Sequence, residues 1–131
     1  MKRTTLLHAE LSEVIARLGH GDLLVIGDAG LPIPDGPRRI DLAVSANVPL
    51  FIDVLSAVLA EMQVESAIVA DELWPANPGI HAALRRQLGD TSVSTLPHEQ
   101  FKAATRAARA IVRTGEFSPY ANVILRAGVV F

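Results

Sequence analysis

The sequence lacks cysteine altogether, which excludes disulfide bonds, thiol catalysis and Cys-based zinc sites. It also lacks any apolar run near the ~20 residues that a membrane-spanning helix needs. The first ten residues contain only two adjacent apolar side chains, Leu6 and Leu7, before polar residues return, which is too short for a signal peptide. We therefore expect a cytoplasmic protein without membrane insertion.

Positive charge is also scarce, since the formal net charge is −2 and no basic stripe is visible. A nucleic-acid partner is therefore not expected. The length of 131 residues fits a single domain over residues 1–131, which can bury roughly two-thirds of its unfolded surface without a metal or a disulfide. Half of the residues are hydrophobic, which is a high share for so small a chain and predicts a subunit interface in a homo-oligomer.

Hydrophobic periodicity predicts strands that alternate with helices. Helical spacing is found over residues 6–18, from Pro49 to Met62, near 80–88, and from Pro97 to Val112. Short apolar runs predict strands over 22–27, 40–44, 64–70 and 91–96, with a closing strand or hairpin over 122–131; residues 74–78 are predicted as a turn. This order favours an α/β domain with a largely parallel sheet and helices on both faces.

Two polar side chains flank the predicted strand over 22–27. His20 lies between Gly19 and Gly21, either as a helix cap that gains from the helix dipole or as a proton donor near neutral pH. Asp28 follows the carboxyl end of the strand, where ligands bind in open α/β sheets. Asp28 either shapes an Asx-turn, or it accepts hydrogen bonds from sugar hydroxyls or orients a histidine.

A second group of candidates lies later in the chain. His98 falls in the first turn of a predicted helix, and Tyr120 and Asn122 flank Ala121 beside the last strand. Each has an ordinary structural interpretation: a solvated helix residue, a half-buried ring and a turn residue. Tyr120 and Asn122 also suit an uncharged hydroxyl-bearing ligand. No two histidines are spaced i,i+4, and no dinucleotide fingerprint, Walker loop or Gly-x-Ser-x-Gly elbow is present.

Seven sequence blocks stand out along the chain: Arg17-Leu-Gly-His-Gly-Asp, Gly27-Asp-Ala-Gly-Leu-Pro-Ile-Pro, Arg39-Ile-Asp-Leu-Ala, Glu61-Met-Gln-Val-Glu, Pro97-His-Glu-Gln-Phe-Lys, Thr114-Gly-Glu and Ser118-Pro-Tyr-Ala-Asn. In their order and spacing they resemble the D-ribose pyranase family from end to end, although the segment 74–95 looks variable and short. The related fucose mutarotases share the Gly-His-Gly-Asp and the next Asp, but look different after that Asp and lack the His-Glu-Gln-Phe block.

The resemblance implies interconversion of the pyranose and furanose forms of D-ribose, without cofactor or metal, in a cytoplasmic ring-shaped homodecamer of two stacked pentamers. It implies His20 as the proton donor, and sugar contacts from Asp28, His98, Tyr120, Ala121 and Asn122. The general base stays open between His98 and a bound water. Two alternatives are a non-catalytic sugar-binding accessory protein of a ribose uptake system and a mutarotase for another sugar such as fucose.

The spacing of His20 and Asp28 poses a geometric problem. Eight extended residues span about 26 Å, far more than one sugar. Either the chain folds back, or two subunits each supply one of the two side chains. We favour the second arrangement, a composite site.

Overall fold

The computed structural model describes residues 1–131 and contains one six-stranded mixed sheet of order β2-β5-β1-β6-β3-β4. Five strands run parallel to one another, and only β6, inserted between β1 and β3, runs antiparallel to its neighbours. The expected largely parallel sheet is thus confirmed. The strands are β1 (Leu23–Gly27), β2 (Arg38–Asp41), β3 (Val64–Ala70), β4 (Ser92–Leu96), β5 (Ala110–Arg113) and β6 (Val123–Ala127).

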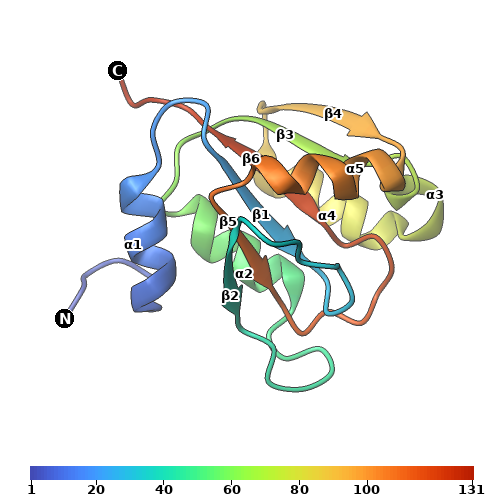
Figure 1. Ribbon diagram of the computed structural model, residues 1–131, viewed down its shortest axis with the longest axis horizontal. Coiled ribbons are helices and arrows are strands. Elements are labelled where there is room, and N and C mark those ends of the chain that lie inside the picture. Colours follow the sequence, from blue (N-terminus) through green and yellow to red (C-terminus); the bar gives the residue numbers. More distant parts are fainter.

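Helices cover both faces of the sheet, as expected. In Figure 1, α5 lies over the near face, while α2 and α4 lie behind the sheet. No helix is both long enough and apolar enough to cross a membrane. The helices are α1 (Ala9–Arg17), α2 (Phe51–Leu59), α3 (Leu73–Ala76), α4 (Pro78–Leu88) and α5 (His98–Ala104), which continues into a 3-10 turn, Thr105–Ala107.

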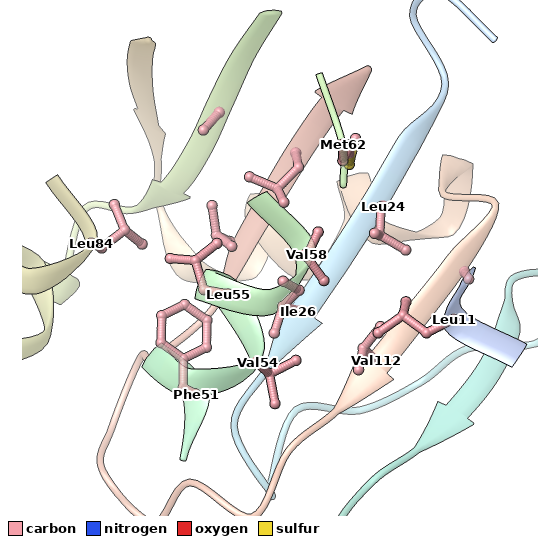
Figure 2. Close-up of a cluster of buried hydrophobic side chains, with 14 of the residues drawn as sticks. Leu11, Leu24, Ile26, Phe51, Val54, Leu55, Val58, Met62, Leu84 and Val112 are labelled. Atoms are coloured by element: carbon pink, nitrogen blue, oxygen red, sulfur yellow. The ribbon is translucent and has the colours of Figure 1, made fainter. Parts of the chain in front are cut away.

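Successive side chains of the central strands point to opposite faces of the sheet, so the hydrophobic core has two parts, one on each face. Leu24 and Ile26 of β1 point toward α1, α2 and α4, whereas Val25 points toward Phe101 of α5. Figure 2 shows the larger cluster, in which side chains of α2 such as Leu55 and Val58 pack against β1. All five of these aliphatic side chains are fully buried, so β1 is held firmly between the two layers.

The structure corrects the predicted helix from Pro97 to Val112. The helix ends at Ala104, and Ala110–Arg113 forms β5, which pairs in parallel with both β1 and β2. Alanines at helical spacing made the sequence pattern ambiguous between helix and strand. The short buried run Ala-Ile-Val is extended because it pairs with a strand on each side.

Smaller differences concern the ends of elements. The helix predicted over 6–18 begins only after His8, whose ring accepts a hydrogen bond from the Leu11 amide as an N-cap. The strand predicted over 40–44 lies at Arg38–Asp41. The predicted turn over 74–78 overlaps the short helix α3 and reaches the first residue of α4. The closing strand is single, because residues 129–131 carry no regular structure.

Gly115 lies where the loop after β5 meets the loop before α2. A Cβ added to Gly115 would press on the carbonyl oxygen of Val48 and lie 2.6 Å from that of Ser45, so both backbone segments would have to move. We expect Gly115→Ala to destabilise the protein by about 1–3 kcal/mol, as overpacking does. Gly79, in α4, has open space around it, so Gly79→Ala should be neutral or stabilise by up to about 1 kcal/mol. Urea unfolding of both variants checks this, and equal stabilities would contradict it.

Candidate functional site

The carboxyl edge of the sheet brings together most of the predicted site residues. Asp28 directly follows β1, and His98 follows β4 after a single proline. Because β6 is antiparallel, its first residue lies at this same edge, so Tyr120, Ala121 and Asn122 arrive beside Asp28. Three segments that are distant in sequence therefore meet where ligands bind in open α/β sheets.

Asp28 and Asn122 form the best-defined contact of this edge. The side-chain oxygen of Asn122 accepts the Asp28 backbone N–H at 2.8 Å, and its amide nitrogen donates to Asp28 Oδ2 at 3.0 Å. Asp28 Oδ1 accepts the Gly30 N–H at 2.9 Å, which makes the Asx-turn considered above. Asn122 is fully buried, so its two hydrogen bonds fix the orientation of the Asp28 carboxylate.

His98 packs among aromatic rings at the start of α5. Its ring stands edge-on to Tyr120, with centroids 5.0 Å apart, and is stacked on Phe101 at 6.2 Å. Both carboxylate oxygens of Glu72 accept the His98 backbone N–H. His98 Nδ1 is buried without a hydrogen-bond partner, so Nε2 is the ring nitrogen that a ligand can reach.

Tyr120 and Ala121 set the path of the chain into β6. Tyr120 has a positive φ of 58°, an uncommon conformation for a residue with a bulky side chain, and its carbonyl accepts the Asn122 N–H at 2.8 Å. Ala121 is fully buried and belongs to the larger core cluster. The left-handed turn thus keeps the Tyr120 ring beside His98 while Asn122 points toward Asp28.

A cleft of about 370 Å³ opens beside Asp28, large enough for a monosaccharide. It contains one buried carboxylate, Glu116, whose Oε1 accepts the first amide of α2 at 3.3 Å. No three His, Asp or Glu side chains lie close enough together to bind a metal ion. The cleft is lined by Asp28, Ala29, Gly30, Arg113, Glu116, Phe117, Ser118 and Pro119.

His20 lies at the opposite, amino edge of the sheet, separated from Asp28 by the whole of β1. Its Nε2 lies 3.1 Å from Glu65 Oε2, at the start of β3. Asp22 shapes the turn before β1, because its Oδ2 accepts the Gly19 N–H at 2.8 Å and its Oδ1 accepts from Arg109. The chain does not fold back, so a single subunit does not bring His20 to the Asp28 cluster.

Glu65, Arg126 and Glu116 were missed as candidate functional residues by sequence reasoning. Glu65 and Glu116 both fall inside blocks that carry the family resemblance, which was the only available signal. Arg126 lies in no such block, and only the pairing of β6 shows its proximity to Glu65.

These features define an α/β protein with a polar cleft beyond the carboxyl ends of its strands, the edge where small molecules bind in open α/β sheets. A model of the RbsD / FucU transport protein family matches residues 1–130, and the chain belongs to this family.

The chain resembles relatives over its full length. It is 62% identical to the D-ribose pyranase of Paracidovorax citrulli and 58% identical to that of Symbiobacterium thermophilum, each covering 100% of both chains. Among solved structures, Bacillus subtilis RbsD complexed with D-ribose superposes with a TM-score of 0.96 at 44% identity, covering 100% of both chains. The fucose mutarotase of Streptococcus pneumoniae, in complex with L-fucose, gives 0.79 at 26% identity, over 95% of this chain and 94% of that one.

The hydrogen bonds in the turn that carries His20 predict a lowered pKa for Asp22. The hydrogen bond from the Gly19 amide, followed by that from the Arg109 guanidinium, lowers the pKa of Asp22 below its ordinary value of 3.8. Since this pKa is depressed in the folded state, the stability that Asp22 adds is present above pH 3.8 and is lost as the pH falls through the lower value.

Arg109→Gln should raise the pKa of Asp22 only partway toward 3.8, because the Gly19 hydrogen bond remains. A carboxyl ¹³C NMR titration measures this directly. Arg86→Gln, on the exposed side of α4, is the control and should leave the titration unchanged. A pKa at or above 3.8 in the wild type would contradict the interpretation.

Proposed function

We propose that the protein is a D-ribose pyranase, an isomerase that interconverts the pyranose and furanose forms of ribose. The observation that carries this proposal is the cluster of Asp28, Asn122, Tyr120 and His98 at one sheet edge. These side chains offer a carboxylate, an amide, a phenol and an imidazole, which suit an uncharged polyhydroxyl ligand. The full-length similarity to relatives named D-ribose pyranase, and to RbsD complexed with D-ribose, supports the same substrate.

The reaction needs only proton transfers. A donor, assigned here to His20, protonates the ring oxygen, while a base removes the proton of the anomeric hydroxyl; the ring C–O bond breaks and leaves an open-chain aldehyde. After rotation about one carbon–carbon bond, a different hydroxyl attacks the carbonyl carbon. That hydroxyl gives its proton to the deprotonated donor, and the protonated base returns its proton to the former carbonyl oxygen, so both groups regain their starting states. The base is His98 or a bound water held by the cluster.

The position of His20 supports a site shared between subunits. A five-residue parallel strand separates His20 from Asp28, a distance of roughly 16 Å for the strand alone. Each sheet edge also exposes apolar side chains, Val44 and Phe117 at the carboxyl edge and residues 129–131 near the amino edge. The C-terminal segment lies near the loop that carries His20 (Figure 1), where Gly21 donates to the Ala127 carbonyl. We infer that the amino edge of one subunit covers the carboxyl edge of the next.

Such a head-to-tail contact closes into a ring when the rotation between subunits permits it. We therefore propose a ring-shaped homo-oligomer, in the form of two stacked pentamers that the family resemblance implies. Residues 1–131 act in it as one domain, with the single sheet as its framework. We propose the cytoplasm as the site of action, and cell fractionation tests that location.

Two alternative functions, a sugar-binding accessory protein and a fucose mutarotase, can be distinguished from a ribose pyranase by measurement. A sugar-binding accessory protein would use the same cluster without turnover. A fucose mutarotase is suggested by the neighbour with bound L-fucose, although its identity of 26% is lower than the 44% of RbsD.

Saturation-transfer NMR between ribose ring forms tests the activity. The purified protein should accelerate pyranose–furanose exchange on D-ribose more than on other sugars in a panel that includes L-fucose. His20→Ala should lower the rate by about 100-fold to 10,000-fold, the usual contribution of a positioned acid, while ribose still binds. An exchange rate equal to that in buffer would end the proposal in favour of a binding protein.

Complementation tests the shared site. His20→Ala and Asp28→Asn should each give nearly inactive oligomers. Co-expressed with different affinity tags and purified through both, the two variants should form mixed oligomers in which some sites combine an intact His20 with an intact Asp28, so activity returns. If both residues of a site came from one chain, the mixed oligomers would stay as inactive as either variant alone.

A further inference from the structure

The two ring nitrogens of His20 have different surroundings. Nε2 lies 3.1 Å from Glu65 Oε2. A carboxylate only accepts hydrogen bonds, so Nε2 carries the hydrogen of this contact. Nδ1 makes no hydrogen bond within the chain, and the side chain of His20 is 59% exposed. The nitrogen that remains available to a ligand is therefore Nδ1.

Glu65 is itself held by Arg126, whose Nε lies 3.4 Å from the same carboxylate oxygen. Arg126 comes from the antiparallel strand β6, where it is paired with Leu23 of β1 on one side and Ser66 of β3 on the other. The turn that carries His20 also lies against Arg126. At Gly21, with a φ of +84°, an added Cβ would lie 3.3 Å from the guanidinium. Three neighbouring strands thus fix the imidazole.

The exposure of this group decides what it contributes. The side chains of His20, Glu65 and Arg126 are 59%, 47% and 54% exposed in the single chain. Ion pairs this exposed contribute only about 0–1 kcal/mol to stability. The consequence of the arrangement is geometric instead: it selects the tautomer of the imidazole and the direction in which the free nitrogen points.

We propose that Glu65, held by Arg126, is a positioning residue that binds the Nε2–H of His20 so that Nδ1 faces the sugar. The imidazolium form of the ring carries a hydrogen on both nitrogens and donates the Nδ1 proton to the ring oxygen of the sugar. The ring is then left as the neutral Nε2-protonated tautomer, whose Nδ1 takes the proton of the attacking hydroxyl when the ring recloses. This inference rests on the proposed function for the role of His20. It assigns to Glu65 no contact with the substrate.

Exchange kinetics in a double-mutant cycle test the proposal. Glu65→Ala should lower kcat by about 10-fold to 100-fold with little change in KM, because the donor is misdirected while the sugar contacts of Asp28 and Asn122 remain. Glu65→Gln should recover part of the rate, since its amide oxygen still accepts from Nε2. In the His20→Ala background, Glu65→Ala should cost no further rate, because the residue acts only through the imidazole. Glu13→Ala, which removes a similarly exposed and ion-paired carboxylate on α1, is the matched control.

Two kinetic results would overturn the assignment: a Glu65→Ala rate as close to wild type as that of Glu13→Ala, or an equal loss with and without His20. A readout independent of activity separates this inference from the proposed function. ¹⁵N NMR of His20, at a pH where the ring is neutral, should show the Nε2-protonated tautomer in the wild type and a larger share of the Nδ1-protonated tautomer in Glu65→Ala. An unchanged tautomer ratio contradicts the role of Glu65, whereas absent exchange by the wild type contradicts only the pyranase activity.

Discussion

The antiparallel pairing of β6 between β1 and β3 is the constraint on which both ends of the molecule depend. Because β6 runs against its neighbours, it begins at the carboxyl edge and ends at the amino edge. Its start places Asn122 against Asp28, and its end places Arg126 against Glu65. A register shift of one residue would turn Arg126 toward the core and Leu125 toward the other face, so core packing fixes both contacts at once.

The two clusters differ in burial, and this sets what each contributes. The Asp28–Asn122 contact includes a fully buried amide whose loss of partners would cost about 1–3 kcal/mol, so the Asp28 cluster is rigid within one chain. The His20 cluster is half exposed and adds little to folding. Covering this edge with another surface would exclude water from the cluster. The same edge carries exposed apolar residues 129–131, which gain from being covered in the same way.

Local patterns predicted much of the fold. The strand over 64–70 was predicted with its observed bounds, and the helices α2 and α4 were placed within a few residues. Prediction failed at β5, where Ala108, Ile111 and Val112 fit a helical face as well as a buried strand. Four residues are too few for hydrophobic periodicity to distinguish a helix from a strand. Ala110–Arg113 is extended because it pairs with β1 on one side and β2 on the other.

The sequence alone marked most of the candidate residues, because side-chain chemistry and motif spacing are local properties. Residue types marked His20, Asp28, His98, Tyr120 and Asn122, and the family resemblance added Ala121. Neighbours across the sheet are not local. The order β2-β5-β1-β6-β3-β4 decides which strand ends adjoin, and it arises from the packing of all layers together. Folding therefore joined Asp28 to Asn122 and gave His20 its partner Glu65, while it placed His20 and Asp28 at opposite edges of one sheet.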